Sequence, residues 1–423
     1  MIVQELCSCR FELNCRTKTA DAAEIESTAP KMSVLRLIGF KLILDNLIFF
    51  SPLIIILYHP TIFSAFRNFA TPVGLDLLEQ RRRSTPGQRV SYGLLAYLLS
   101  NSSGPQMTPK PGTRFQYNID VVGSCNLRCP SCPVGNMGAA VMPKGLMSKA
   151  TLAKVLDKID RERPAERIMV GLYDWGEPTL HPQLAEMIKM VKDAGFESQI
   201  SSNLNVDNQL RDLVKSEPNS FIVSTSGMYD ATYDATHTGG SAKMLKSNLY
   251  KLAWYRDRYD TNTDFVIYYH LYKHNRGRDL LAAREIAKEL GFRLETFAAY
   301  LYPMEKNLAA IDGILPQHDQ ALVDLLLLTP EQRIRLLRKA AANTPDHPMV
   351  RDCSHRTGKM SIRFDTSVPL CCTVYDQSTD VAQSFLDTPH EDIQTAKYNR
   401  SICAQCMGNA LHIVARIHGD NPD

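Results

Sequence analysis

Between residues 115 and 300, short apolar runs alternate with longer amphipathic stretches, which predicts β-strands separated by α-helices. The runs are rich in β-branched and aromatic residues, whereas the stretches between them repeat apolar residues every three or four positions. One such helical stripe consists of Leu184, Met187, Ile188 and Val191. The predicted strands are FQYNIDVV (115–122), RIMVGLY (167–173), ESQIS (197–201), FIVSTS (221–226), FVIYYHLY (265–272) and RLETFAAY (293–300).

The order of these elements predicts an α/β fold of about six strand-helix units. Strands joined by helical crossovers form a parallel sheet, which is either open and doubly wound or curled into a barrel. Periodicity alone does not choose between the two. In both arrangements the functional site is expected at the carboxyl ends of the strands, where the loops converge.

Changes in composition divide the chain into four predicted parts. Residues 80–113 are rich in proline, glycine, serine and charge, which is typical of a linker. After residue 302 the sequence changes to charged helical segments, followed by a cysteine-bearing tail. The predicted parts are a mainly helical N-terminal extension (1–112), a core (113–302), a helical connector (303–350) and a small C-terminal domain (351–423).

Residues 34–63 are the most apolar stretch and include the run LIFFSPLIIILY (47–58). A spanning helix needs roughly 20 apolar residues, and Asp45 and Lys41 lie just before this run. A spanning helix, an interfacial helix and a helix packed on the protein body therefore all remain open. The first thirty residues carry no secretory signal pattern, and Met32 is an alternative start. We expect a cytoplasmic protein with peripheral membrane contact through residues 34–63 as a hypothesis.

The composition is that of a globular protein, with 423 residues of which 44% are hydrophobic. The balance of 48 basic against 45 acidic side chains gives a net charge of +3, so charge offers no argument for a nucleic-acid partner and none is expected. Eleven cysteines are too few for a disulfide scaffold of this size. Eight of them form two groups more than 200 residues apart, which indicates metal binding in a reducing compartment.

The first group is Cys125, Cys129 and Cys132, just after the first predicted strand. Thiolates are soft ligands that favour zinc, copper or iron-sulfur clusters. No histidine follows closely to complete a tetrahedral zinc site, and an open metal position is typical of catalysis rather than of structure. The alternative is that the three thiols are simply buried in a turn.

This CxxxCxxC spacing, in a loop after the first strand, resembles the signature of the radical S-adenosylmethionine (radical SAM) enzymes. The resemblance implies a partial (β/α)6 TIM-like barrel and a [4Fe-4S] cluster held by Cys125, Cys129 and Cys132. It also implies that S-adenosylmethionine binds the fourth iron and is cleaved to a 5′-deoxyadenosyl radical, which abstracts hydrogen from a substrate. Such cofactors carry the difficult chemistry, while the protein orients them and excludes water.

Two further stretches support the resemblance. The segment YDWGEPTLHP (173–182) is similar to the family's GGEP motif, which implies that Gly176, Glu177 and Pro178 bind the cofactor. Glycine allows close backbone approach, and a glutamate accepts from an ammonium group. SSNLN (201–205) resembles the ribose-contacting stretch through Ser202 and Asn203, although a helix N-cap is an alternative there.

Other positions depart from the family pattern. Ser226 and His237 stand where an acidic residue and an arginine are usual, so no carboxylate contact is assigned to position 237. Ser131 replaces the aromatic residue that often precedes the third cysteine. His270 and Asn275 are candidate site residues, with satisfied core or rim polar groups as the alternative.

The second group can supply four thiolates, from Cys353, one of the adjacent pair Cys371 and Cys372, Cys403 and Cys406. A closed site of this kind suits zinc or an iron-sulfur cluster. The region resembles the SPASM or twitch extension of many radical SAM enzymes, which implies one auxiliary [4Fe-4S] cluster. We name Cys371 as the ligand of the pair and leave Cys372 as the alternative.

Together these features favour a radical SAM enzyme that oxidises, epimerises or similarly modifies a carbohydrate or peptide, with an electron donor such as flavodoxin or ferredoxin. The alternatives are a zinc-stabilised binding or scaffold protein with a degenerate core, and an enzyme that matures a ribosomal peptide. No cobalamin-binding segment is recognisable ahead of the core, which argues against the B12-dependent branch.

Overall fold

The computed structural model describes residues 114–136, 144–343, 345–346 and 348–413. The predicted N-terminal extension, including residues 34–63, lies outside these ranges. Within them, no helix combines the length and the apolar character that crossing a membrane requires.

A single parallel sheet of seven strands organises the described chain, in the order β6-β5-β4-β3-β2-β1-β7. The sheet is open, because β6 and β7 are its two edges, and it confirms the predicted α/β fold with a partial barrel. The strands are β1 (Arg114–Asp120), β2 (Arg167–Gly171), β3 (Glu197–Ser202), β4 (Ser220–Thr225), β5 (Asp264–Leu271), β6 (Arg293–Ala298) and β7 (Lys359–Arg363).

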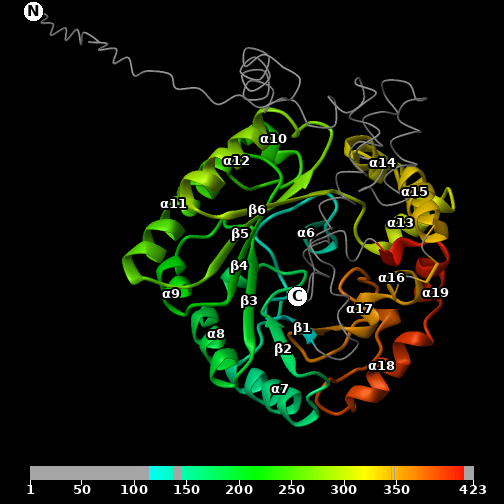
Figure 1. The fold of residues 1–423 in the computed structure, drawn as a ribbon, viewed down its shortest axis with the longest axis horizontal. Coiled ribbons are helices and arrows are strands. Elements are labelled where there is room, and N and C mark those ends of the chain that lie inside the picture. Colours follow the sequence, from blue (N-terminus) through cyan, green and yellow to red (C-terminus); the bar gives the residue numbers. More distant parts are fainter. Residues whose placement is uncertain (1–113, 137–143, 344, 347, 414–423) are drawn as a thin grey trace, which may run out of the picture. The chain divides into compact units, whose positions relative to one another are not determined.

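Helices follow strands β1 to β5 and lie along one side of the sheet, as Figure 1 shows. Their apolar stripes pack on the sheet in one continuous core. Ser148 caps the first of these long helices by accepting from the backbone N–H of Thr151 at 3.0 Å. The helices are α7 (Lys149–Glu162), α8 (Leu184–Asp193), α9 (Leu210–Lys215), α10 (Asp230–Asp234), α11 (Ala242–Tyr259) and α12 (Arg278–Leu290).

The strands present different chemistry on their two faces. On β4, Phe221 and Val223 are fully buried against the helices, whereas Ser220 and Ser224 line a large cavity on the other face. Side chains alternate between faces along a strand, so this period-2 pattern makes the inner face of the sheet polar. The sheet therefore surrounds a polar cavity instead of a second apolar core.

The chain after β6 crosses to the other edge of the sheet, where β7 pairs in parallel with β1. This strand was not predicted, and it places the start of the expected C-terminal domain directly beside the core strand that precedes the cysteine triplet. The remaining helices are α6 (Pro133–Asn136), α13 (Met304–Ile311), α14 (Gln317–Leu325), α15 (Pro330–Asn343), α16 (Pro348–Arg351), α17 (Ser354–Thr357), α18 (His390–Tyr398) and α19 (Ser401–Gly408), with 3₁₀ turns η1 (Pro178–Leu180), η2 (Gln377–Thr379) and η3 (Leu411–Ile413).

Candidate functional site

The cysteine triplet lies in the loop that follows β1, at the carboxyl end of the sheet, as predicted. The loop is folded on itself, since the backbone N–H of Cys132 donates to the carbonyl of Cys129 at 3.0 Å. The backbone N–H of Leu127 donates to the Cys125 sulfur at 3.4 Å. No disulfide joins any of the eight cysteines within the described ranges.

Loops from three other strands hold the triplet loop in place. The N–H of Glu177, after β2, donates to the carbonyl of Ser124 at 2.9 Å. From the end of β3, the Asn203 side-chain amide lies 3.7 Å from the Cys125 sulfur. After β4, the carbonyl of Thr238 accepts from the N–H of Arg128 at 2.8 Å. The loops of neighbouring parallel strands therefore meet at the cysteines.

Gly176 stands where two loops approach too closely for any side chain. A Cβ atom at this position would overlap the carbonyl oxygen of Val122. The Gly176 N–H donates to Asp120 Oδ1 at 3.1 Å, which ties the loop to the end of β1. The requirement for glycine here is therefore steric and comes from the chain itself. The predicted approach of this backbone to S-adenosylmethionine stays a prediction.

Glu177 is buried and acts as the junction of two loops. Its Oε1 accepts from the Thr179 N–H at 3.0 Å, the Thr179 hydroxyl at 2.6 Å and the Ser202 hydroxyl at 2.8 Å. Its Oε2 accepts from the Asn203 N–H at 2.8 Å. A carboxylate oxygen has two lone pairs, so Oε2 retains capacity for one more donor. Pro178 is buried at the first position of η1.

Ser202 and Asn203 are brought to the site, but their described polar contacts are internal. Ser202 bonds Glu177, and the Asn203 amide also donates to Asn126 Oδ1 at 2.9 Å. Neither is a helix N-cap, because α9 begins at Leu210 after Gln209. Their assignment to the ribose of S-adenosylmethionine stays a prediction.

Burial raises the pKa of each thiol of the triplet. The pKa of Cys125 rises to about 12, chiefly through burial and then through the nearby carboxyl of Glu177. The pKa values of Cys129 and Cys132 rise for the same main reason. The thiols are therefore protonated unless a cation such as iron compensates the thiolate charge.

A buried carboxyl group, Asp120 at the end of β1, and a half-buried one, Asp174, lie close to each other at the loop between β2 and η1. Burial, and after it the charge of Asp174, raises the pKa of Asp120 to about 8. Burial raises the pKa of Asp174 to about 7, while Ser361 and the cations Lys359 and Arg363 act in the opposite direction. Asp174 lines the large cavity, so an ionisable carboxyl faces this space. Sequence reasoning missed both residues.

The positions that depart from the family pattern form a buried neutral network. The Ser226 hydroxyl lies 2.8 Å from His237 Nδ1, and the Ser224 hydroxyl lies 3.3 Å from His270 Nε2. Burial lowers the pKa of His237 to about 4 and that of His270 to about 3, so both rings are neutral at physiological pH. Asn275 is a satisfied core amide, because it donates to the carbonyls of Ser226 and His270 at 2.7 Å each.

The triplet opens onto the large cavity, which has a volume of about 1060 Å³ and runs along the inner face of the sheet. Cys129 and Cys132 line its end at the carboxyl side of the strands. At the opposite end the charged side chains pair with one another, as in Arg293 with Asp264 at 2.7 Å. Most other lining groups are hydroxyls, amides and aromatic rings, among them Asn118, Trp175, Gln199, Ser201, Ser224 and Tyr268.

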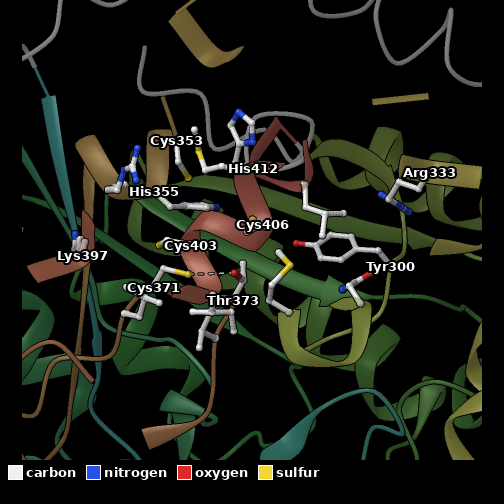
Figure 2. Close-up of a pocket in the computed structure, with 18 residues that line it drawn as sticks. Tyr300, Arg333, Cys353, His355, Cys371, Thr373, Lys397, Cys403, Cys406 and His412 are labelled. Atoms are coloured by element: carbon white, nitrogen blue, oxygen red, sulfur yellow. Dashed lines mark hydrogen bonds between the residues drawn. The ribbon is translucent and has the colours of Figure 1, made fainter. Parts of the chain in front are cut away.

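The second cysteine group surrounds a separate, small cavity of about 50 Å³ (Figure 2). Cys353 precedes α17, Cys371 lies in the loop after β7, and Cys403 and Cys406 lie one turn apart on α19. Apolar side chains form much of the wall, including Met304, Leu370, Val374, Ile402 and Leu411. Residues from separated elements therefore enclose this site, whereas a single loop carries the first.

The adjacent cysteines face different spaces, which separates their roles. Cys371 lines the small cavity with the other three cysteines, and its sulfur lies 3.1 Å from the Thr373 hydroxyl (Figure 2). Cys372 instead lines the large cavity, 3.8 Å from His355 Nδ1. The choice of Cys371 as the fourth ligand stays a prediction.

Burial also raises the pKa of the four thiols of the small cavity, to about 11 for Cys403. The choice between an auxiliary iron-sulfur cluster and zinc at this site stays a prediction.

An aromatic cluster and a buried lysine also lie around the two cavities. No sequence pattern predicted either of them. Trp175 makes edge contacts with Tyr302 and Tyr375, with ring centroids 5.8 and 5.4 Å apart. Tyr300 lines both cavities and therefore forms part of the wall between them. Lys397 is 1% exposed and lines the small cavity.

Comparisons with known proteins agree with this site. Residues 119–270 match the family described as the radical SAM superfamily. Over 216 residues the chain is 26% identical to the "tungsten-containing aldehyde ferredoxin oxidoreductase cofactor-modifying protein" of Pyrococcus furiosus, a match that covers 51% of this chain. It covers 52% of that relative, so the chain spans about half the length of the curated protein it matches.

The solved structures to which the chain is similar include those of anSMEcpe and SuiB. The structure of native anSMEcpe with bound AdoMet is 12% identical, with a TM-score of 0.46, and the match covers 69% of this chain and 82% of that one. The structure of SuiB from Streptococcus suis is also 12% identical, with a TM-score of 0.46 and 84% of each chain covered.

Proposed function

We propose that this chain, whose residues 119–270 match the radical SAM superfamily, cleaves S-adenosylmethionine reductively and modifies a carbohydrate or peptide substrate. A [4Fe-4S] cluster bound by Cys125, Cys129 and Cys132 would supply the electron that generates the 5′-deoxyadenosyl radical. The observation that carries the proposal is the convergence of four strand ends on a three-thiol loop that opens onto a large cavity.

The residues around the triplet then receive distinct roles. Gly176 keeps the loop after β2 close to β1, and Glu177 presents Oε2 to the ammonium group of S-adenosylmethionine. Ser202 and Asn203 orient Glu177 through its two carboxylate oxygens. This arrangement would place the Glu177 carboxylate beside the cluster, where it is shielded from solvent.

The large cavity favours a polar substrate of low net charge. Arg293 and Asp264 pair with each other, as do Arg114 and Glu197 at 3.3 Å. The hydroxyl and amide groups of the wall suit hydrogen bonding to hydroxyls, and Trp175 offers an aromatic surface for a sugar ring. These features support a carbohydrate more than an acidic or basic peptide.

An auxiliary [4Fe-4S] cluster held by Cys353, Cys371, Cys403 and Cys406 is the second part of the proposal. Its four ligands leave no open iron position, so its role would be to accept or pass an electron. Tyr300 in the wall between the cavities places this site next to the substrate space. A flavodoxin-type or ferredoxin-type protein would supply electrons to the chain.

The test is anaerobic reconstitution, followed by iron and sulfide analysis and by assay of 5′-deoxyadenosine and methionine after reduction. We expect about eight irons per chain and reductant-dependent cleavage. Zinc without acid-labile sulfide would instead indicate a scaffold protein, and a protein that holds its core cluster yet cleaves no S-adenosylmethionine would overturn the proposal.

The substrate class can be tested by isotope transfer. Pools of perdeuterated neutral oligosaccharides and of perdeuterated short peptides are offered separately to the reduced enzyme. We expect deuterium in 5′-deoxyadenosine with the oligosaccharides, because the radical takes its hydrogen atom from the bound substrate. Transfer from the peptides alone would contradict the carbohydrate assignment.

A further inference from the structure

Lys397 is an unusual side chain to find beside four cysteines. It lies near the end of α18, is 1% exposed and lines the small cavity with Cys353, Cys371, Cys403 and Cys406 (Figure 2). A buried lysine ammonium costs free energy unless it is hydrogen-bonded and a negative charge lies near it. The position therefore calls for a compensating anion.

The hydrogen-bond partner of the Lys397 ammonium group is a neutral carbonyl and not an anion. Lys397 Nζ donates to the carbonyl of Lys359, on β7, at 2.7 Å. The carbonyl supplies a dipole but no net charge. Burial lowers the pKa of Lys397 to about 8, and the groups that act in the opposite direction are the thiols of Cys371, Cys353, Cys372 and Cys403.

Two other cations line the small cavity, Arg333 and Arg356. Arg333 donates to the carbonyls of Ala298 and Ala299 at 3.2 and 2.7 Å, whereas Arg356 differs from Lys397 in having a carboxylate partner. Arg356 forms an ion pair with Asp352, and its Nε donates to Asp352 Oδ1 at 2.9 Å. Its guanidinium also lies over the ring of Tyr398 at 3.8 Å from the centroid. The charge of Arg356 is therefore largely compensated by a carboxylate.

A cluster with four thiolate ligands would complete the charge balance at Lys397. The thiolates outweigh the positive charge of the iron-sulfide core, so the whole centre is an anion, and reduction adds one more negative charge. A fixed cation in a low-dielectric site stabilises the reduced form more than the oxidised form. A neighbouring cation consequently raises the reduction potential.

We propose that Lys397 raises the reduction potential of the auxiliary cluster and so makes this cluster an electron acceptor for the chain. This inference rests on the proposed function, because it requires that the small cavity holds a redox-active cluster. Lys397 is a positioning and tuning residue in this account, since it does not touch the substrate cavity.

The test is an EPR-monitored redox titration of the fully loaded protein and of Lys397→Met. At a fixed potential we expect the ratio of reduced to oxidised auxiliary cluster to fall about tenfold in the variant, which corresponds to a shift of about 59 mV toward negative values. Lys397→Arg keeps the charge and should titrate like the parent protein. Arg356→Gln is the matched control and should shift less, because Asp352 already compensates that charge.

A structural role alone would lower cluster content without moving the potential of the loaded fraction. If Lys397→Met does not bind the auxiliary cluster, the reduction potentials of Lys397→Gln and Lys397→Arg are compared instead. Glutamine retains a hydrogen-bond donor but carries no charge, whereas arginine retains both. An unchanged potential in the neutral variants, or an equal fall in Lys397→Arg, would overturn the inference. Iron and sulfide counts in the parent protein report separately on whether the auxiliary cluster exists, and zinc there would overturn the proposed function and this inference together.

Discussion

The two cysteine groups use the same side chain in different surroundings, one open to a large cavity and one enclosed. The first places Cys125, Cys129 and Cys132 on one loop at the edge of a polar cavity of about 1060 Å³. The second gathers its four thiols from three separated segments around an apolar cavity of about 50 Å³. An open site leaves one iron position for an outside ligand, whereas a closed site protects a centre that only exchanges electrons.

The surrounding polar groups differ in the same way. Around the triplet, Glu177 and the backbone of three loops provide directed hydrogen bonds, and Gly176 permits close approach. Around the second group, the conspicuous polar feature is a buried cation, Lys397. The first environment is suited to orienting a ligand, and the second to setting a potential.

The largest expected effect comes from removing one ligand at each site. Cys129→Ala should abolish formation of 5′-deoxyadenosine while the auxiliary iron remains, because two thiolates do not hold an open cluster. Cys403→Ala should lose the auxiliary iron and retain cleavage of S-adenosylmethionine. Iron analysis and product assay of both variants provide the measurement. Cleavage by Cys129→Ala would break the comparison.

A smaller effect is expected from the same glycine substitution near each site. Gly176→Ala drives a Cβ into the carbonyl of Val122, so we expect a loss of about 1–3 kcal/mol in the free energy of unfolding and weaker cleavage. Gly408 is the matched control, because a Cβ there meets nothing within 4 Å and the residue ends α19. Gly408→Ala should be neutral or stabilise by up to about 1 kcal/mol.

Denaturant unfolding of the metal-free variants in reducing buffer gives both values. If the two alanine variants changed stability by the same amount and in the same direction, the steric account of Gly176 would be wrong.

The smallest expected effect concerns pH. Burial raises the pKa of the thiols at both sites, so each ligand releases one proton when iron binds, and cluster retention weakens as pH falls. The closed site releases four protons and the open site three, so the closed site should show the steeper dependence. Iron retained against a chelator is measured from pH 6 to pH 9 in Cys129→Ala and Cys403→Ala. Equal slopes would contradict the ligand counts.

Much of the fold followed from local patterns. All six predicted strands are present, and their ends differ from prediction by at most two residues. The exception is β7, whose sequence KMSIR alternates polar and apolar residues over only five positions, whereas all five residues are buried. Its charged residue Arg363 is buried because it meets a partner elsewhere in the chain, Asp380 at 2.9 Å. A short stretch of sequence does not reveal such pairing with residues far along the chain.

The candidate site was predictable where a residue's role depends on spacing. The position of the triplet loop after β1 belongs to this class, whereas the predicted ligand roles of the triplet and of Gly176 stay predictions. The orientation of Cys371 against Cys372 depends on the path of the loop after β7, and the position of Lys397 depends on how α18 packs. Asp120 and Asp174 acquire raised pKa values only through tertiary burial. The contacts of S-adenosylmethionine with Glu177, Ser202 and Asn203 stay predictions.

The central claim is that the chain carries two clusters, of which only one binds S-adenosylmethionine. The most direct measurement is EPR of the reduced, fully loaded protein before and after addition of S-adenosylmethionine, with Cys129→Ala and Cys403→Ala alongside. We predict that the signal retained in Cys403→Ala shifts on addition and that the signal retained in Cys129→Ala does not. A shift in Cys129→Ala, or no second signal in the parent protein, would contradict the account.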